Sequence, residues 1–81
     1  MNSRSTDRFA KNLYAAPSRV RKDFEKQLRH LLRDLRHPSL NAKKYDEERD
    51  IWQARVNRAW RFYFQIDGDT YVLLSIIPHP K

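Results

Sequence analysis

The hydrophobic period of the chain changes once, near residue 51, and this change constrains the fold more than any other feature. Before that point, apolar residues recur every three or four positions, which indicates one side of an amphipathic helix. These residues are Val20, Phe24, Leu28, Leu31, Leu32 and Leu35. After that point, apolar and polar residues alternate, as they do on half-buried strands. The chain is therefore predicted to be α+β, with its helices before its strands.

Two prolines divide the helical half. A first helix is predicted over about residues 6–15, because Pro17 cannot continue it. A second helix is predicted over about residues 18–36, because Pro38 disfavours helical geometry at the residue before it. The two helices are joined by a tight turn, so we expect them to form an N-terminal helical hairpin.

Three strands are expected in the second half, over residues 51–56, 60–66 and 71–77. The Asp67-Gly68-Asp69 sequence between the last two is a hairpin signal. The polar residues 38–50 are interpreted as a connection. Residues 1–81 are thus expected to form a single domain, a helical hairpin packed on a three-stranded antiparallel sheet, with a fourth strand allowed.

The chain is strongly basic, with 17 Lys and Arg against 10 Asp and Glu, a formal charge of 17 − 10 = +7. Such an excess favours a polyanionic partner, and eleven of the cations are Arg, which suits bidentate phosphate contact. No cysteine is present, which excludes disulfides and cysteine zinc sites. No metal or cofactor site is predicted. No apolar run approaches bilayer length, so we expect a soluble cytoplasmic protein without a membrane partner.

Two arginines are predicted to lie side by side. If residues 57–59 form a three-residue loop, Arg55 is opposite Arg61 on the sheet face away from the helices. Like charges paired across strands are unfavourable by some tenths of a kcal/mol, so such a pair makes physical sense as an anion clamp. Tyr63 is predicted on the same face, and the chain end brings His79 to its edge.

These residues supply the minimum chemistry for cleaving RNA without a metal. Arg61 and Arg55 would bind the scissile phosphate and stabilise the negative charge that grows in the transition state. His79 would give a proton to the leaving 5′-oxygen, and Tyr63 would hold an unstacked base. No general base for the 2′-hydroxyl is evident. The plainer alternative is that the arginines are solvated, with their stems covering apolar surface, and that His79 is inert.

The segment Trp52–Phe64, WQARVNRAWRFYF, resembles the double strand of the RelE/ParE superfamily, the toxins of bacterial type II toxin–antitoxin modules. The Asp/Gly turn, the apolar strand and the short end with a histidine extend the resemblance from about Phe9 to the end of the chain. There are two departures. The family usually begins with an edge strand, whereas residues 1–5 are polar and too short for much of a strand. Ala42 stands where some members carry a catalytic glutamate.

The resemblance implies a RelE/YoeB-like, ribosome-dependent endoribonuclease that cuts mRNA and inhibits translation. It puts Arg61 on the scissile phosphate, with Arg55 as a second basic residue and His79 as the terminal histidine. Further RNA contacts are expected from Lys43, Lys44, Arg58, Tyr63 and Lys81. The implied partners are mRNA on the ribosome and a cognate acidic antitoxin in a hetero-oligomeric complex. The alternatives are a ParE-like inhibitor of DNA gyrase without nuclease activity and a degenerate toxin that only binds its antitoxin.

Overall fold

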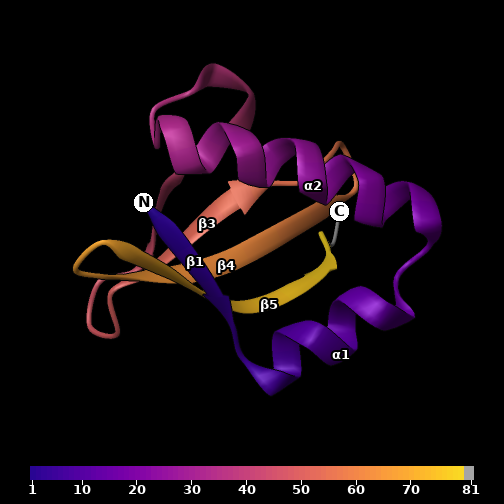
Figure 1. Ribbon diagram of the computed structural model, residues 1–81, viewed down its shortest axis with the longest axis horizontal. Helices are drawn as coiled ribbons and strands as arrows, with labels where there is room; N and C mark the ends of the chain where they lie inside the picture. Colours follow the sequence, from indigo (N-terminus) through magenta and orange to yellow (C-terminus); the bar gives the residue numbers. More distant parts are fainter. Residues whose placement is uncertain (80–81) are drawn as a thin grey trace.

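The computed structural model describes residues 1–79 and confirms a mixed α+β chain. Within this range the elements are β1 (Asn2–Ser5), α1 (Asp7–Ala15), α2 (Ser18–Arg33), the 3-10 turn η1 (Pro38–Leu40), β2 (Lys43–Asp46), β3 (Ile51–Arg55), β4 (Trp60–Asp67) and β5 (Thr70–Pro78). The described strands form one five-stranded sheet in the order β1-β5-β4-β3-β2 (Figure 1). The prediction of three or four antiparallel strands is therefore wrong, and the described sheet is mixed.

The first missed strand is β1, which pairs in parallel with β5 although all its residues are exposed. Backbone bonds hold it, because Asn2 N–H donates to the Asp69 carbonyl at 2.8 Å and Thr6 N–H to the Leu73 carbonyl at 3.0 Å. The Thr6 hydroxyl also caps α1 by accepting from the Phe9 N–H at 3.1 Å. Hydrophobic alternation could not reveal this strand, because it buries none of its side chains.

The second missed strand is β2, which lies within the segment interpreted as a connection. It pairs antiparallel with β3, with Lys43 opposite Gln53 and Lys44 opposite Trp52. The register shifts around Tyr45, so the strand is irregular as well as polar. Both properties hide its period of two from the sequence pattern.

The helices share a core but do not form the clear N-terminal hairpin that was predicted. Helix α1 lies against β5 (Figure 1). Helix α2 packs on β4 instead, where the rings of Phe24 and Phe62 lie 5.2 Å apart. The helices touch through Phe9 and Phe24, whose ring centroids are 5.1 Å apart. Each amphipathic helix is thus positioned mainly by the strands it covers.

Helix α2 ends at Arg33, three residues before the predicted end at 36. Asp34 adopts an extended conformation, with φ −159° and ψ 104°. Its carboxylate accepts a hydrogen bond from the Arg36 N–H at 2.9 Å. Aspartate offers the backbone this local alternative to helical bonding, and here the alternative ends the helix ahead of Pro38. Neither α1 nor α2, the helices of residues 1–79, is long and apolar enough to cross a bilayer.

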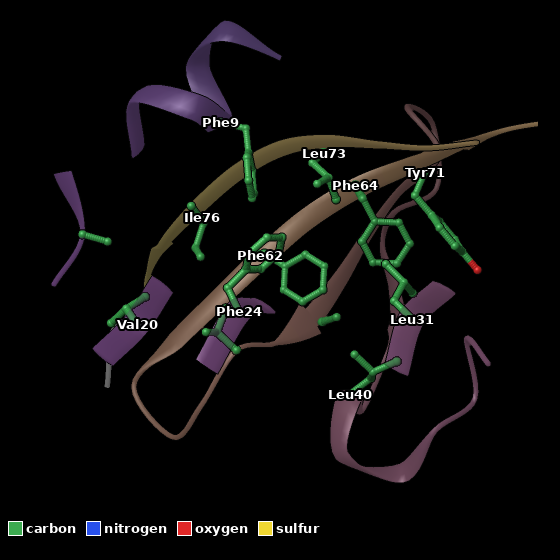
Figure 2. Close-up of a cluster of buried hydrophobic side chains, with 13 residues drawn as sticks. Phe9, Val20, Phe24, Leu31, Leu40, Phe62, Phe64, Tyr71, Leu73 and Ile76 are labelled. Atoms are coloured by element: carbon green, nitrogen blue, oxygen red, sulfur yellow. The ribbon is translucent and has the colours of Figure 1, made fainter. Parts of the chain in front are cut away.

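A chain of aromatic rings runs through the core between the helices and the sheet (Figure 2). From Phe24 on α2 it passes to Phe62 and Phe64 on β4, whose centroids are 5.7 Å apart, and on to Tyr71 at 5.4 Å. Phe62 and Phe64 are fully buried, and each such ring stabilises the fold by about 1.5–3 kcal/mol. These side chains all lie on one side of the sheet.

The sheet therefore has two distinct faces, which we call the covered face and the open face. The covered face lies under the helices and carries the register row Ala54, Phe62 and Ile76. The open face carries two rows. They are Arg55, Arg61 and Ile77, and Gln53, Tyr63 and Ser75. Within β5, Leu74 is an extra residue, because Ser75 pairs with Tyr63 while Leu73 pairs with Phe64.

Candidate functional site

The open face holds the two arginines that the sequence predicts side by side. Arg55, the last residue of β3, is directly opposite Arg61 on β4. The intervening loop is closed by Asn57, whose side-chain oxygen accepts from the backbone N–H groups of Ala59 at 2.9 Å and Trp60 at 3.0 Å. The turn chemistry of this loop fixes the register and so brings the two positive charges together.

The Arg61 side chain is anchored on the loop. Its Nη1 donates to the carbonyls of Asn57 at 2.7 Å and Trp60 at 2.9 Å. Burial, and then the neighbouring Arg55 charge, lower the pKa of Arg61 from its usual value, while Tyr63 partly opposes this. A partly buried cation beside a like charge is a preorganised site for an anion, which would relieve the repulsion.

No carboxylate neutralises this arginine pair within residues 1–79. The ion pairs in that part of the chain join Lys44 to Asp50 at 2.5 Å and Arg49 to Asp46 at 3.8 Å. Both lie around the β2–β3 turn. The two guanidinium groups of the open face thus keep their charge available for a ligand.

A buried glutamine, which the sequence interpretation missed, fixes the main chain at Arg55. Gln27 on α2 donates from Nε2 to the Arg55 carbonyl at 2.8 Å and to the Ser39 carbonyl at 2.9 Å. Its own oxygen accepts from the Ser39 hydroxyl at 3.0 Å. Gln27 is 5% exposed, so these bonds are shielded from water. The sequence offered one signal for this role, because Gln27 is a polar residue next to the apolar stripe of the helix.

A cleft of about 450 Å³ opens on the open face. Its lining includes Tyr63 and Tyr45, whose rings meet edge to face with centroids 4.9 Å apart. The Tyr63 hydroxyl accepts from Gln53 Nε2 at 2.9 Å, which holds the ring in place. Thr6 and Arg8, from the start of α1, line the same cleft. Of these four residues, only Tyr63 was predicted on this face, because Tyr45, Thr6 and Arg8 lie outside the predicted strands; Ser75 and Ile77, which also line the cleft, were expected there from the third strand.

His79 follows β5 and lies beside the β3–β4 loop. Its backbone N–H donates to the Ala59 carbonyl at 2.7 Å, one step beyond the pairs of Pro78 with Trp60 and Ile77 with Arg61. Its side chain is exposed. The structure thus brings the chain end to the end of the sheet that holds the arginine pair.

The other predicted RNA contacts are spread over several places. Lys43 is exposed and lies in the open-face row of Gln53 and Tyr63, and Arg58 is exposed in the β3–β4 loop. Lys44 lies instead in the row of Trp52, on the other face, where it bonds Asp50 and sits 5.1 Å from the Trp52 ring centroid. The predicted Lys81 lies outside the described residues. Within residues 1–79, no three His, Asp or Glu side chains gather as a candidate metal site.

Comparison with known proteins rests on structure. No family model matches the sequence, and no curated protein does so either. The YoeB/ParE toxin from Agrobacterium tumefaciens is similar, with a TM-score of 0.82 and 13% identity over 99% of this chain and 100% of that chain. The isolated RelE toxin from E. coli gives a TM-score of 0.79 at 18% identity, covering 99% of this chain and 85% of that chain.

The RelBE2 toxin–antitoxin complex from Mycobacterium tuberculosis gives a TM-score of 0.77 at 22% identity, covering 96% of each chain. At such identities the likeness concerns the fold. The chain has the fold of the RelE and YoeB toxins, which confirms the fold that the sequence resemblance implies.

Proposed function

We propose that this protein is the toxin of a type II toxin–antitoxin pair, and that it inhibits translation by cutting mRNA on the ribosome without a metal. The observation that carries the proposal is the Arg55–Arg61 pair, two cations held opposite each other on the open face with no carboxylate partner in residues 1–79. Fold alone does not imply function, so the proposal depends on this site.

The arginine pair suits a phosphodiester. Arg61 is held by loop carbonyls through Nη1, and a guanidinium has further donors on Nε and Nη2 in a fixed planar fork. Arg55 adds a second fork from across the sheet. Together they would bind the two non-bridging oxygens and stabilise the additional charge as the 2′-oxygen attacks phosphorus.

His79 and Tyr63 would complete the reaction site. As the bond from phosphorus to the 5′-oxygen breaks, His79 would donate a proton to that oxygen while the 2′-hydroxyl proton passes to water, and the products would be a 2′,3′-cyclic phosphate and a free 5′-hydroxyl. Tyr63 and Tyr45, at the cleft beside the pair, would stack an unpaired base. Lys43 adds a further cation to the open face.

An acidic antitoxin is the proposed protein partner. The net charge of +7 favours association with an acidic chain, and the similar structure from M. tuberculosis is a toxin–antitoxin complex. Such a partner would keep the arginine pair from RNA by covering it or by occupying it with carboxylates.

The test is an in vitro translation reaction in which mRNA 5′ ends are mapped. The wild-type protein is expected to produce cuts within the codon in the ribosomal A site. Arg61→Ala is expected to lower the cleavage rate by about 10²–10³-fold, because it removes a preorganised donor to the reacting phosphate. His79→Ala is expected to cause a smaller loss.

The matched control is Arg29→Ala, which removes the same charge from an exposed position on α2 and should cleave as wild type does. Equal rates for Arg61→Ala and wild type would refute the assigned role of the pair. Intact mRNA together with gyrase stalled on supercoiled DNA would overturn the nuclease and favour a ParE-like gyrase inhibitor.

A further inference from the structure

A basic groove lies between α2 and the β3–β4 loop, and it is separate from the cleft that Tyr63 and Tyr45 line. It has a volume of about 390 Å³, and Arg19, Lys26 and Arg55 are the cations that line it. Arg19 and Lys26 lie seven positions apart and therefore on the same side of α2. Figure 1 shows the loop between β3 and β4 beside the first half of this helix.

The groove has a net positive charge. Asp23 is the carboxylate among its lining residues, so the formal charge is 3 − 1 = +2. Asp23 accepts a hydrogen bond from Asn57 Nδ2 at 2.8 Å, which ties α2 to the loop. None of the three cations is in an ion pair within residues 1–79. Their charges are therefore available to a ligand.

The walls of the groove are held in place by contacts between different elements. Gln27 and Ser39 line it and are hydrogen-bonded to each other, and Gln27 also donates to the Arg55 carbonyl. Asn57 lines it as well, and its side chain closes the loop. A preorganised site of this kind loses little conformational entropy when a ligand binds.

Arg55 links the groove to the arginine pair, since it lines the groove and also lies directly opposite Arg61. We propose that the groove is a second phosphate site, which holds the phosphodiester next to the one on the Arg55–Arg61 pair. An RNA strand then runs from the open face over the end of β3 to the side of α2. This inference rests on the proposed function, because it takes the pair as the first phosphate site.

A nucleic acid strand suits the groove better than an acidic peptide does. The phosphates of one strand are regularly spaced along a continuous backbone, which matches two cationic sites that share one arginine. Apart from Val56, the residues that line the groove are polar or charged, which suits a phosphate backbone better than the apolar side chains that a peptide buries at the centre of an interface. Binding here is expected to be independent of base sequence, because no base edge is read.

The experiment compares two double variants that each remove one Arg and one Lys from α2. Arg19→Gln with Lys26→Gln changes the groove, whereas Lys22→Gln with Arg29→Gln changes exposed positions outside it. The probe is a labelled ten-nucleotide 2′-O-methyl RNA, which cannot be cleaved through its 2′-oxygen. Its Kd is measured by fluorescence anisotropy over a range of salt concentrations, and circular dichroism checks the fold of each variant.

The groove variant is expected to weaken RNA binding about tenfold, and to reduce the slope of log K against log salt by about 0.7, because one phosphate contact is lost. The control variant is expected to stay within about threefold of wild type, because it loses only long-range attraction. A ten-residue oligoglutamate should lose the same affinity in both variants.

Equal weakening of RNA binding in the two variants would overturn the inference, as would unchanged binding in the groove variant. Oligoglutamate could also lose as much affinity as RNA does in the groove variant while keeping its affinity in the control variant. In that case the groove binds an acidic protein partner, and the proposed RNA path is wrong. These readings need no catalysis. A wild-type protein that leaves mRNA intact on the ribosome would refute the nuclease, while the comparison of the two variants would still decide the groove.

Discussion

The two faces of the sheet are built from the same strands, yet they are organised by different physical requirements. On β4, Phe62 and Phe64 are completely buried under the helices, whereas Arg61 and Tyr63, which alternate with them, lie on the open face and stay partly exposed. The covered face stabilises the folded state, because it excludes water and packs aromatic rings against each other. The open face keeps two like charges opposite each other, an arrangement that stability alone would not select.

The alternating residues of one strand thus serve two separable purposes, stability on one face and binding on the other. Substitutions on the covered face should change the free energy of unfolding, and substitutions on the open face should change binding and catalysis. This division is a physical argument for function, because a fold keeps unfavourable contacts mainly where they are used. Variants on each face therefore test whether the two faces are separable.

The largest expected effect is the loss of a ring from the covered face. Phe62→Ala should lower the free energy of unfolding by about 3–5 kcal/mol, because it leaves a cavity in the aromatic core. The neighbouring open-face variant Tyr63→Ala should cost at most about 2 kcal/mol, chiefly because Gln53 Nε2 loses its acceptor. Urea denaturation measures both.

RNA binding should depend on the two positions in the reverse order. Phe62→Leu, which keeps the core filled, should retain RNA binding, whereas Tyr63→Ala should reduce it. If Tyr63→Ala destabilises the protein as much as Phe62→Ala does, the two faces are not separable and the comparison is wrong.

A smaller effect on stability is expected at Gln27, which belongs to the buried side of α2 and holds the main chain at Arg55. Gln27→Leu should lower the free energy of unfolding by about 1–3 kcal/mol, because the buried carbonyls of Arg55 and Ser39 lose their donor. The matched control is Gln65→Leu, which removes a hydrogen bond to the exposed Arg49 carbonyl, where water can replace it. That control should stay within about 0.5 kcal/mol of wild type in the same urea titrations. Equal losses in the two variants would show that burial of Gln27 is not what matters.

The smallest expected effect has the opposite sign. Arg55→Gln should raise the free energy of unfolding by about 0.2–1 kcal/mol, because it removes the like charge opposite Arg61. The same variant should weaken RNA binding. Arg58→Gln, in the exposed loop, is the control and should leave stability unchanged. A loss of stability in Arg55→Gln would mean that the arginine stems pack favourably enough to outweigh their repulsion.

The parts of this architecture that sequence could predict are those with a repeating pattern. The alternation around Arg55 and Arg61 and the short loop between them are enough to place the pair opposite each other on one face. The stripe on α2 likewise predicts a helix that covers a sheet. The polar strand β1 follows no such pattern, because backbone bonds hold it and its side chains stay in water.

The surroundings of the pair depend on segments that are distant in the sequence. Gln27 meets Arg55 across 28 positions, and Tyr45 meets Tyr63 only because β2 joins the edge of the sheet. Local periodicity has no information about such contacts, since it describes each element separately. The cleft and the basic groove could be found only once the elements had been placed in space.

The extra residue in β5 has a consequence for the chain end. Ahead of Leu74, odd-numbered side chains such as Tyr71 and Leu73 point to the helices; beyond it, the even-numbered Ile76 does so. This reversal of parity turns Ser75 and Ile77 towards Tyr63 and Arg61, and His79 follows two positions later, where its backbone N–H bonds the Ala59 carbonyl. One leucine without a cross-strand partner therefore decides which side chains of the last part of β5 lie beside the arginine pair.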